Sequence, residues 1–254
     1  MTLRLHRPIL AGLTALMLAG TAHAAPDLTG FWDYRGRVEA ARDSNPPPVV
    51  PELAARRAKA AKAREGGFVR SVSNMLCLPT GFPAMMQWKS PIEILAGAGR
   101  LVVLSEHDPG NDEPRTIYLD RPMPADPDTS WNGYSVGHWE GETLVIDTAG
   151  FNDRGGVFGL PRGATTKITE RLHLEDGGKT LIDALTVTDP KTLTAPWTVT
   201  LKYDRMPADT ERFEAVCEPD LEALKATDLK AIKDIDSEAA RMLDPKLAYN
   251  PGAK

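Results

Sequence analysis

The stretch from Thr166 to Thr188 reads TKITERLHLEDGGKTLIDALTVT, and its pattern decides the fold. Apolar and polar residues alternate on both sides of its centre, as they do in half-buried β-strands. Between the two halves, Asp176–Lys179 contains two glycines and predicts a tight reversal. We therefore expect an antiparallel hairpin here.

The same period of two continues in both directions from this hairpin. Short linkers leave no room for crossover helices, so the strands should pair antiparallel as a meander. A meander of about eight strands closes most economically into a β-barrel, because closure removes exposed edges. The sequence thus predicts a mainly β protein, with a first strand at Asp27–Arg35 and later strands at Ile92–Ala96, Arg100–Glu106, Arg115–Asp120, Tyr134–Trp139, Thr143–Thr148, Thr166–Glu175, Thr180–Thr188 and Trp197–Asp204.

Helical periodicity flanks the predicted barrel. Leu53–Glu65 is rich in alanine, lysine and arginine and predicts a helix on the surface. From Pro219 onward, leucines and isoleucines at helical spacing predict a C-terminal helix that packs on the barrel or caps its mouth. We expect one domain over residues 25–254.

The first 24 residues have the pattern of a secretory signal. Arg4 and Arg7 precede an apolar stretch that is too short to span a bilayer. The stretch ends in an A-x-A site, so cleavage is expected after Ala24, with a retained anchor as the alternative. No later segment is long and apolar enough to cross a membrane, which predicts a periplasmic or secreted protein.

Composition excludes several classes of protein. The chain has 254 residues, 42% of them hydrophobic, which is normal for a globular core. Its net charge of −5 argues against a nucleic-acid partner. In an oxidising compartment its two cysteines, Cys77 and Cys217, favour a single disulfide, and two buried free thiols are the alternative.

Two carboxylates are expected on the inner wall of the Thr166–Thr188 hairpin. Glu170 alternates in phase with apolar neighbours, and Asp183 does the same on the returning strand. With Asp176–Lys179 as the loop, the two residues lie diagonal to each other. Burial and like charge should each raise a carboxyl pKa there, which suits proton transfer. An inward Arg115 either pairs with Glu170 or holds an acidic ligand; a salt bridge or an outward bulge are the structural alternatives.

A second candidate group lies on the Tyr134–Thr148 hairpin. With Glu140-Gly141 as a two-residue loop, Tyr134 opposes Asp147 and shares its face with His138. If this face lines the cavity, His138 is a natural general base. The alternative is an exposed His138 beside an apolar core on the other face.

Longer stretches resemble a known family. Ser130–Asp153, SWNGYSVGHWEGETLVIDTAGFND, resembles a signature of a large family of exported bacterial proteins with a lipocalin-like β-barrel, and Gly30-Phe31-Trp32 is similar to the lipocalin G-x-W opening. The chain departs from the family pattern at residues 162–165, where members often carry histidine. The resemblance implies no particular activity. Further similar pieces are CLPTGFPAMM from Cys77, RTIYLD from Arg115, ITER from Ile168, VTDPKTLTAPWT from Val187 and VCE around Cys217.

These observations favour an exported barrel whose cavity binds a small, largely apolar or aromatic molecule. Cofactor-free acid/base catalysis of the lyase, decarboxylase or isomerase type is the first expectation, because no metal or nucleotide motif is present. A non-catalytic carrier and a structural envelope protein with a filled barrel are the alternatives. The sequence gives no indication of the oligomeric state. The catalytic candidates are Glu170, His138, Tyr134 and Asp147, and the ligand-binding candidates are Arg115, Tyr118, Asp183 and Trp197.

Overall fold

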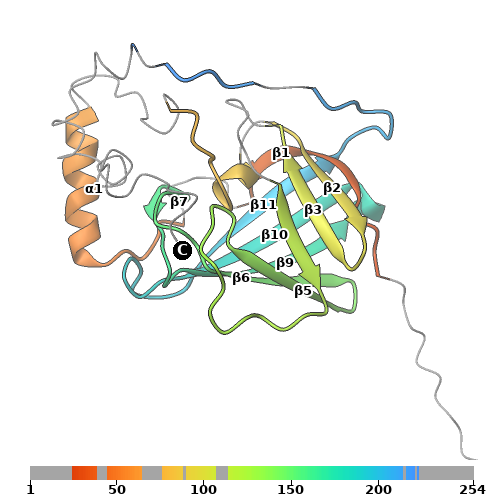
Figure 1. Cartoon of the computed structure of the whole chain (residues 1–254), viewed down its shortest axis with the longest axis horizontal. Helices are drawn as coiled ribbons and strands as arrows, with labels where there is room; N and C mark the ends of the chain where they lie inside the picture. Colours follow the sequence, from red (N-terminus) through yellow and green to blue (C-terminus); the bar gives the residue numbers. More distant parts are fainter. Residues whose placement is uncertain are drawn as a thin grey trace, which may run out of the picture.

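The computed structural model describes residues 25–38, 45–64, 76–87, 90–106, 114–213, 216–220 and 222. Nine strands form a closed barrel in the order β1-β11-β10-β9-β6-β5-β4-β3-β2 (Figure 1). The predicted barrel is confirmed, with nine strands in place of about eight. The strands are β1 Gly30–Arg37, β2 Ile92–Gly97, β3 Arg100–Ser105, β4 Arg115–Leu119, β5 Tyr134–Glu140, β6 Thr143–Ala149, β9 Lys167–Glu175, β10 Thr180–Thr188 and β11 Trp197–Arg205.

One strand pair departs from the predicted antiparallel meander. β4 and β5 pair in parallel, with Tyr118 opposite Val136. Residues 120–133 carry the chain from the end of β4 back to the start of β5. A connection without a helix is long enough here because the strands are short, so the argument from linker length fails at this place.

Smaller elements surround the barrel. The predicted surface helix is confirmed as α1, Pro51–Arg64, which stands beside one end of the barrel next to a small hairpin (Figure 1). That hairpin, β7 and β8, was not apparent from the sequence. The predicted signal segment and most of the stretch predicted to form a C-terminal helix lie outside the described residues. The remaining elements are β7 Gly156–Val157, β8 Leu160–Pro161 and the short 3-10 helices η1 Ala84–Gln87 and η2 Asp176–Gly178.

One end of the barrel is closed by Trp32 and Arg205. Trp32 is fully buried, and its indole N–H donates to the Leu28 carbonyl. The Arg205 guanidinium lies 4.1 Å from the Trp32 ring centre and donates to the carbonyls of Gly178 and Thr29. Trp32, the last residue of the Gly30-Phe31-Trp32 motif, therefore closes this end through a cation–π contact with Arg205.

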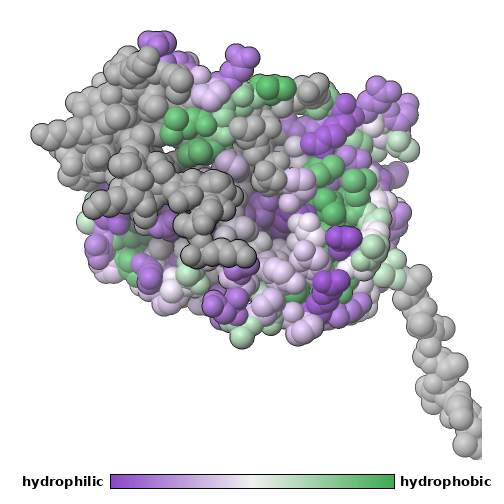
Figure 2. Space-filling view, viewed as in Figure 1, coloured by the Kyte–Doolittle hydropathy of each residue, from purple (hydrophilic) through white to green (hydrophobic). Residues whose placement is uncertain are grey.

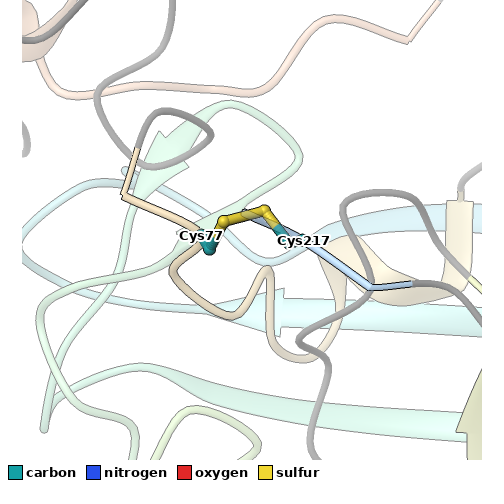
Figure 3. The surroundings of a disulfide bond; sticks show 2 residues. All are labelled: Cys77 and Cys217. Atoms are coloured by element: carbon teal, nitrogen blue, oxygen red, sulfur yellow. A yellow bond between two sulfur atoms is a disulfide. The ribbon is translucent and has the colours of Figure 1, made fainter. Parts of the chain in front are cut away.

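A disulfide joins the segment before η1 to the segment after the last strand (Figure 3). Cys77 and Cys217 have their Cα atoms 5.8 Å apart, as a disulfide requires. The predicted pairing is thus present. Among the described residues, no helix is long and apolar enough to cross a membrane.

Candidate functional site

Arg115 and Glu170 form an ion pair inside the barrel. Their side chains are 1% and 0% exposed. Both terminal guanidinium nitrogens donate to the carboxylate: Nη1 lies 2.8 Å from Oε1, and Nη2 bonds Oε2. Nη2 also lies 3.2 Å from the Thr148 hydroxyl and 3.3 Å from that of Ser135. This bidentate arrangement satisfies a charge pair that would be costly if one member stood alone.

Asp183 lies beside this pair with both carboxyl oxygens buried. Among the described residues, neither oxygen has a hydrogen-bond partner. Burial, and secondly the negative charge of Glu170, hold the pKa of Asp183 well above its usual range, while Arg115 opposes the shift. The site therefore favours a protonated, neutral Asp183 next to the charged Arg115–Glu170 pair.

The register of β9 and β10 is the one predicted from the sequence. Asp183 opposes Leu172, and Glu170 opposes Leu185. The prediction that Glu170 and Asp183 face the lumen is confirmed. Of the two roles considered for Arg115, the structure shows the pairing with Glu170.

A segment of the chain itself occupies the lumen next to Arg115, Glu170 and Asp183. Arg115 Cζ lies 3.5 Å from the centre of the Phe82 ring. The Tyr203 hydroxyl donates to the carbonyl of Met86, the last but one residue of η1. Because Arg115 and Tyr203 point inward, Phe82, Met85 and Met86 must lie inside the barrel, where each is at most 1% exposed. The place where the sequence predicts a ligand is therefore filled by the segment 82–86.

The second predicted group faces outward, so the prediction that it lines the cavity is wrong. The His138 side chain is 53% exposed and lies 3.3 Å from Glu140. Asp147 is exposed and accepts a hydrogen bond from Thr169. Tyr134 stands half-buried on the outer wall. The inner face carries Ser135, Leu144, Ile146 and Thr148 instead.

The register of this hairpin also differs from the prediction, and the turn explains why. Glu140 pairs with Thr143, and Tyr134 opposes Ala149 rather than Asp147. The two-residue loop is thus Gly141-Glu142, with glycine at its first position and a φ of 62°. Turns of this kind favour glycine there. The register shift is two residues, so the same residues still share a face. The sequence could not show which face points into the barrel, because both faces are partly apolar.

Tyr118 and Trp197 separate from the lumen cluster. Tyr118 lies on the outer wall and stacks on Tyr134 with ring centres 5.0 Å apart. Trp197 is buried at the barrel end opposite Trp32, where its ring meets Phe158 edge-on and its N–H donates to the Asn45 carbonyl. Of the four predicted ligand-binding residues, Arg115 and Asp183 therefore lie together in the lumen, whereas Tyr118 and Trp197 lie elsewhere and apart from each other.

A cleft opens outside the barrel, beside α1. It has a volume of about 580 Å³, within the range of small-molecule sites. Its walls come from the start of α1, the segment 151–153, the segment after β8 and the turn before β11. Val50, Leu53 and Pro161 supply apolar surface, while charged side chains line other parts. Together these walls form what we term the mouth cleft.

Arg162 links the mouth cleft to the filled lumen. Its side chain is 3% exposed and lines the cleft, and its Nη1 donates to the Phe82 carbonyl. The guanidinium lies 5.2 Å from the Phe151 ring, which stacks on the Phe82 ring. A Cβ at Gly155 would overlap this guanidinium, so any larger residue there would displace the arginine from its contacts. Arg162 thus fixes the backbone of the segment that fills the barrel.

Asp189 organises the opposite wall of the mouth cleft. Its carboxylate accepts hydrogen bonds from the hydroxyls of Thr165 and Thr166 and from the backbone N–H of Lys191. This carboxylate therefore orders the loop after β8 on the turn before β11. Among the described residues, no three His, Cys, Asp or Glu side chains gather closely enough to hold a metal ion.

Comparisons with known proteins add one distant structural likeness. No protein-family model matches the chain, and no curated protein matches it in sequence. The zebrafish ileal bile acid-binding protein complexed with cholic acid is similar in structure with a TM-score of 0.34 and 11% sequence identity. The similarity covers 70% of this chain and 98% of that one.

No sequence pattern predicted that residues 82–86 would fill the lumen. Phe82, Met85 and Met86 lie in a turn-rich stretch with no helical or strand period. Ser135 and Thr148 were also missed, although they hold Arg115. Thr148 could have been identified from the inward Ile146 on the same strand, because residues two apart on a strand share a face. Ser135 lies directly opposite Thr148 on β5 and therefore faces the same way.

Proposed function

We propose that the protein is an exported binding protein for a small, largely apolar molecule, which it holds in the mouth cleft. The observation that supports this proposal is the cleft itself. It combines the volume of a ligand site with an apolar wall of Val50, Leu53 and Pro161. The lumen, by contrast, is occupied by Phe82, Met85 and Met86. A carrier role requires no proton transfer, so it is consistent with an outward-facing His138.

Export rests on the predicted signal and on the resemblance of Ser130–Asp153 to exported barrels, whose family membership we propose with it. A disulfide between Cys77 and Cys217 suits an oxidising compartment. Intact-mass analysis of protein recovered from the periplasm or medium should find a chain that begins at Ala25. A mass that includes the first 24 residues would contradict the proposal.

Binding in the mouth cleft can be tested with N-phenyl-1-naphthylamine, an uncharged aromatic probe whose fluorescence rises in apolar surroundings. We expect saturable binding with a Kd on the order of 0.1 mM or tighter, at about 0.3 kcal/mol per ligand atom. Ala164→Phe fills the cleft and should weaken binding at least about tenfold. Ala208→Phe, in an exposed turn away from the cleft, is the matched control. Absence of saturable binding, or equal affinity in both variants, would favour a structural role instead.

Acid/base catalysis is the second candidate, favoured by the neighbouring carboxyl groups of Asp183 and Glu170. A protonated acid beside an ionised carboxylate is the division of roles that proton-transfer enzymes use. For this function the segment 82–86 must leave the lumen. Labelling the folded protein with a water-soluble carbodiimide and an amine tests that requirement. Modification of Asp183 in the native state would support the candidate, and a fully protected Asp183 would exclude it.

A further inference from the structure

A second hollow lies on the outer wall of the barrel, where β4 and β5 run parallel. It has a volume of about 280 Å³ and is separate from the mouth cleft. One wall comes from residues 114–118 of β4 and its approach, and the other from Ser130–Tyr134. Gly133 allows the second wall to form, because it has a φ of 67° and a Cβ there would press on the Ala149 carbonyl.

Aromatic side chains dominate this hollow. The rings of Tyr118 and Tyr134 stack with centres 5.0 Å apart and planes 25° apart. Trp131 contributes a third aromatic side chain. All three are half-buried, so each presents part of its surface to solvent. The Arg121 guanidinium stands 4.8 Å from the centre of the Tyr118 ring and extends the stack.

The remaining lining groups are polar and uncharged. Thr116 and Ser130 contribute hydroxyls, Asn132 contributes an amide, and every described residue of the lining is neutral. The lining therefore offers a charged ligand no opposite charge to offset its loss of water. Arg121 is not part of the lining, and its guanidinium already faces the Tyr118 ring. A neutral ligand with one apolar face and a rim of hydroxyls matches both the aromatic rings and the polar groups.

We propose that this hollow binds a pyranose ring of a neutral carbohydrate. The C–H face of the ring packs on the aromatic side chains, and its hydroxyls exchange hydrogen bonds with the Thr116, Ser130 and tyrosine hydroxyls. The volume of about 280 Å³ lies just below the range of roughly 300 to 1,000 Å³ that is typical of pockets for whole small-molecule ligands. The hollow therefore suits one ring of a longer oligosaccharide, with neighbouring rings outside it.

Calorimetry with cellohexaose, maltohexaose and laminarihexaose tests this assignment on the full mature protein. At least one hexasaccharide should bind with a Kd of roughly 1 mM or tighter, and Tyr134→Ala should weaken that binding about tenfold. Leu95→Ala, which removes an exposed apolar side chain from β2 outside the hollow, should bind as the wild type does.

Thr116→Phe provides a second test, because it fills the hollow without removing the Tyr118–Tyr134 stack. It should abolish hexasaccharide binding while the melting temperature stays near that of the wild type, so it decides the question if Tyr134→Ala unfolds. Binding of none of the three sugars at 10 mM, on the order of ten times the expected Kd, would overturn the proposal. So would unchanged affinity in the folded Thr116→Phe variant. Neither result bears on binding in the mouth cleft.

Discussion

Glu170→Gln is the sharpest perturbation of the lumen, because it removes one charge of a pair that is fully buried. Arg115 would keep a hydrogen-bond acceptor in the glutamine but lose its counter-charge. Breaking a buried pair by removing one partner destabilises a protein by about 3 to 5 kcal/mol. Hydroxyls of Ser135 and Thr148 still contact the guanidinium, but they carry no charge to replace the carboxylate.

Asp183 determines how much of that loss appears. Without Glu170, the like charge that helps raise the pKa of Asp183 is gone, and Arg115 attracts the ionised form. Asp183 can then ionise and partly replace the lost partner. We therefore expect Glu170→Gln alone to lose about 2 to 3 kcal/mol, and Glu170→Gln with Asp183→Asn to lose the full 3 to 5 kcal/mol.

Urea unfolding at pH 7, followed by tryptophan fluorescence with the disulfide intact, measures these free energies. Glu140→Gln is the matched control, because it removes the carboxylate from an arginine–glutamate pair on the outer surface. The Glu140 and Arg171 side chains are 49% and 51% exposed, so the control should lose less than about 1 kcal/mol. The reasoning fails if Glu170→Gln unfolds within 1 kcal/mol of the wild type, or if the double variant is no less stable than Glu170→Gln.

Three further changes probe the same structure. Burial raises the pKa of Asp183, so the folded protein keeps a proton that the unfolded chain releases above about pH 4. As pH rises toward the folded pKa, the wild type should lose up to about 1.4 kcal/mol of unfolding free energy per pH unit relative to Asp183→Asn. Urea unfolding of the two proteins with the same pH dependence would contradict this. Cys77→Ser opens a loop of 140 residues closed by Cys217 and should lose up to about 5 kcal/mol in the same assay; equal stability of oxidised and reduced wild-type protein would count against it. Gly155→Ala displaces the Arg162 guanidinium and should lose about 1 to 3 kcal/mol in thermal melting, so an unchanged melting temperature would show that the contact is loose.

Local pattern was sufficient for much of the barrel. Alternation placed each predicted barrel strand within three residues of its observed bounds, and it set the register of β9 and β10. It succeeded there because the Asp176–Lys179 turn and the apolar inner faces of the two strands both require the same register. The Tyr134–Thr148 hairpin shows the limit. Val136 and Val145 make its outer face apolar as well, so the pattern could not say which side His138 occupies.

By itself, the sequence determined the closed barrel, the α1 helix, the pairing of the two cysteines and the inward direction of Glu170 and Asp183. The barrel, the helix and the two inward directions follow from the periodicity of residues close in the chain. The cysteine pairing follows because the chain has only two cysteines. Only the tertiary structure decided what fills the lumen, what pairs with Glu170 and where the hollows open. Phe82, Arg115 and Glu170 come from segments far apart in sequence, and no local period encodes which of them meet. Their contacts depend on closure of the barrel, which sets those distances only once all nine strands are in place.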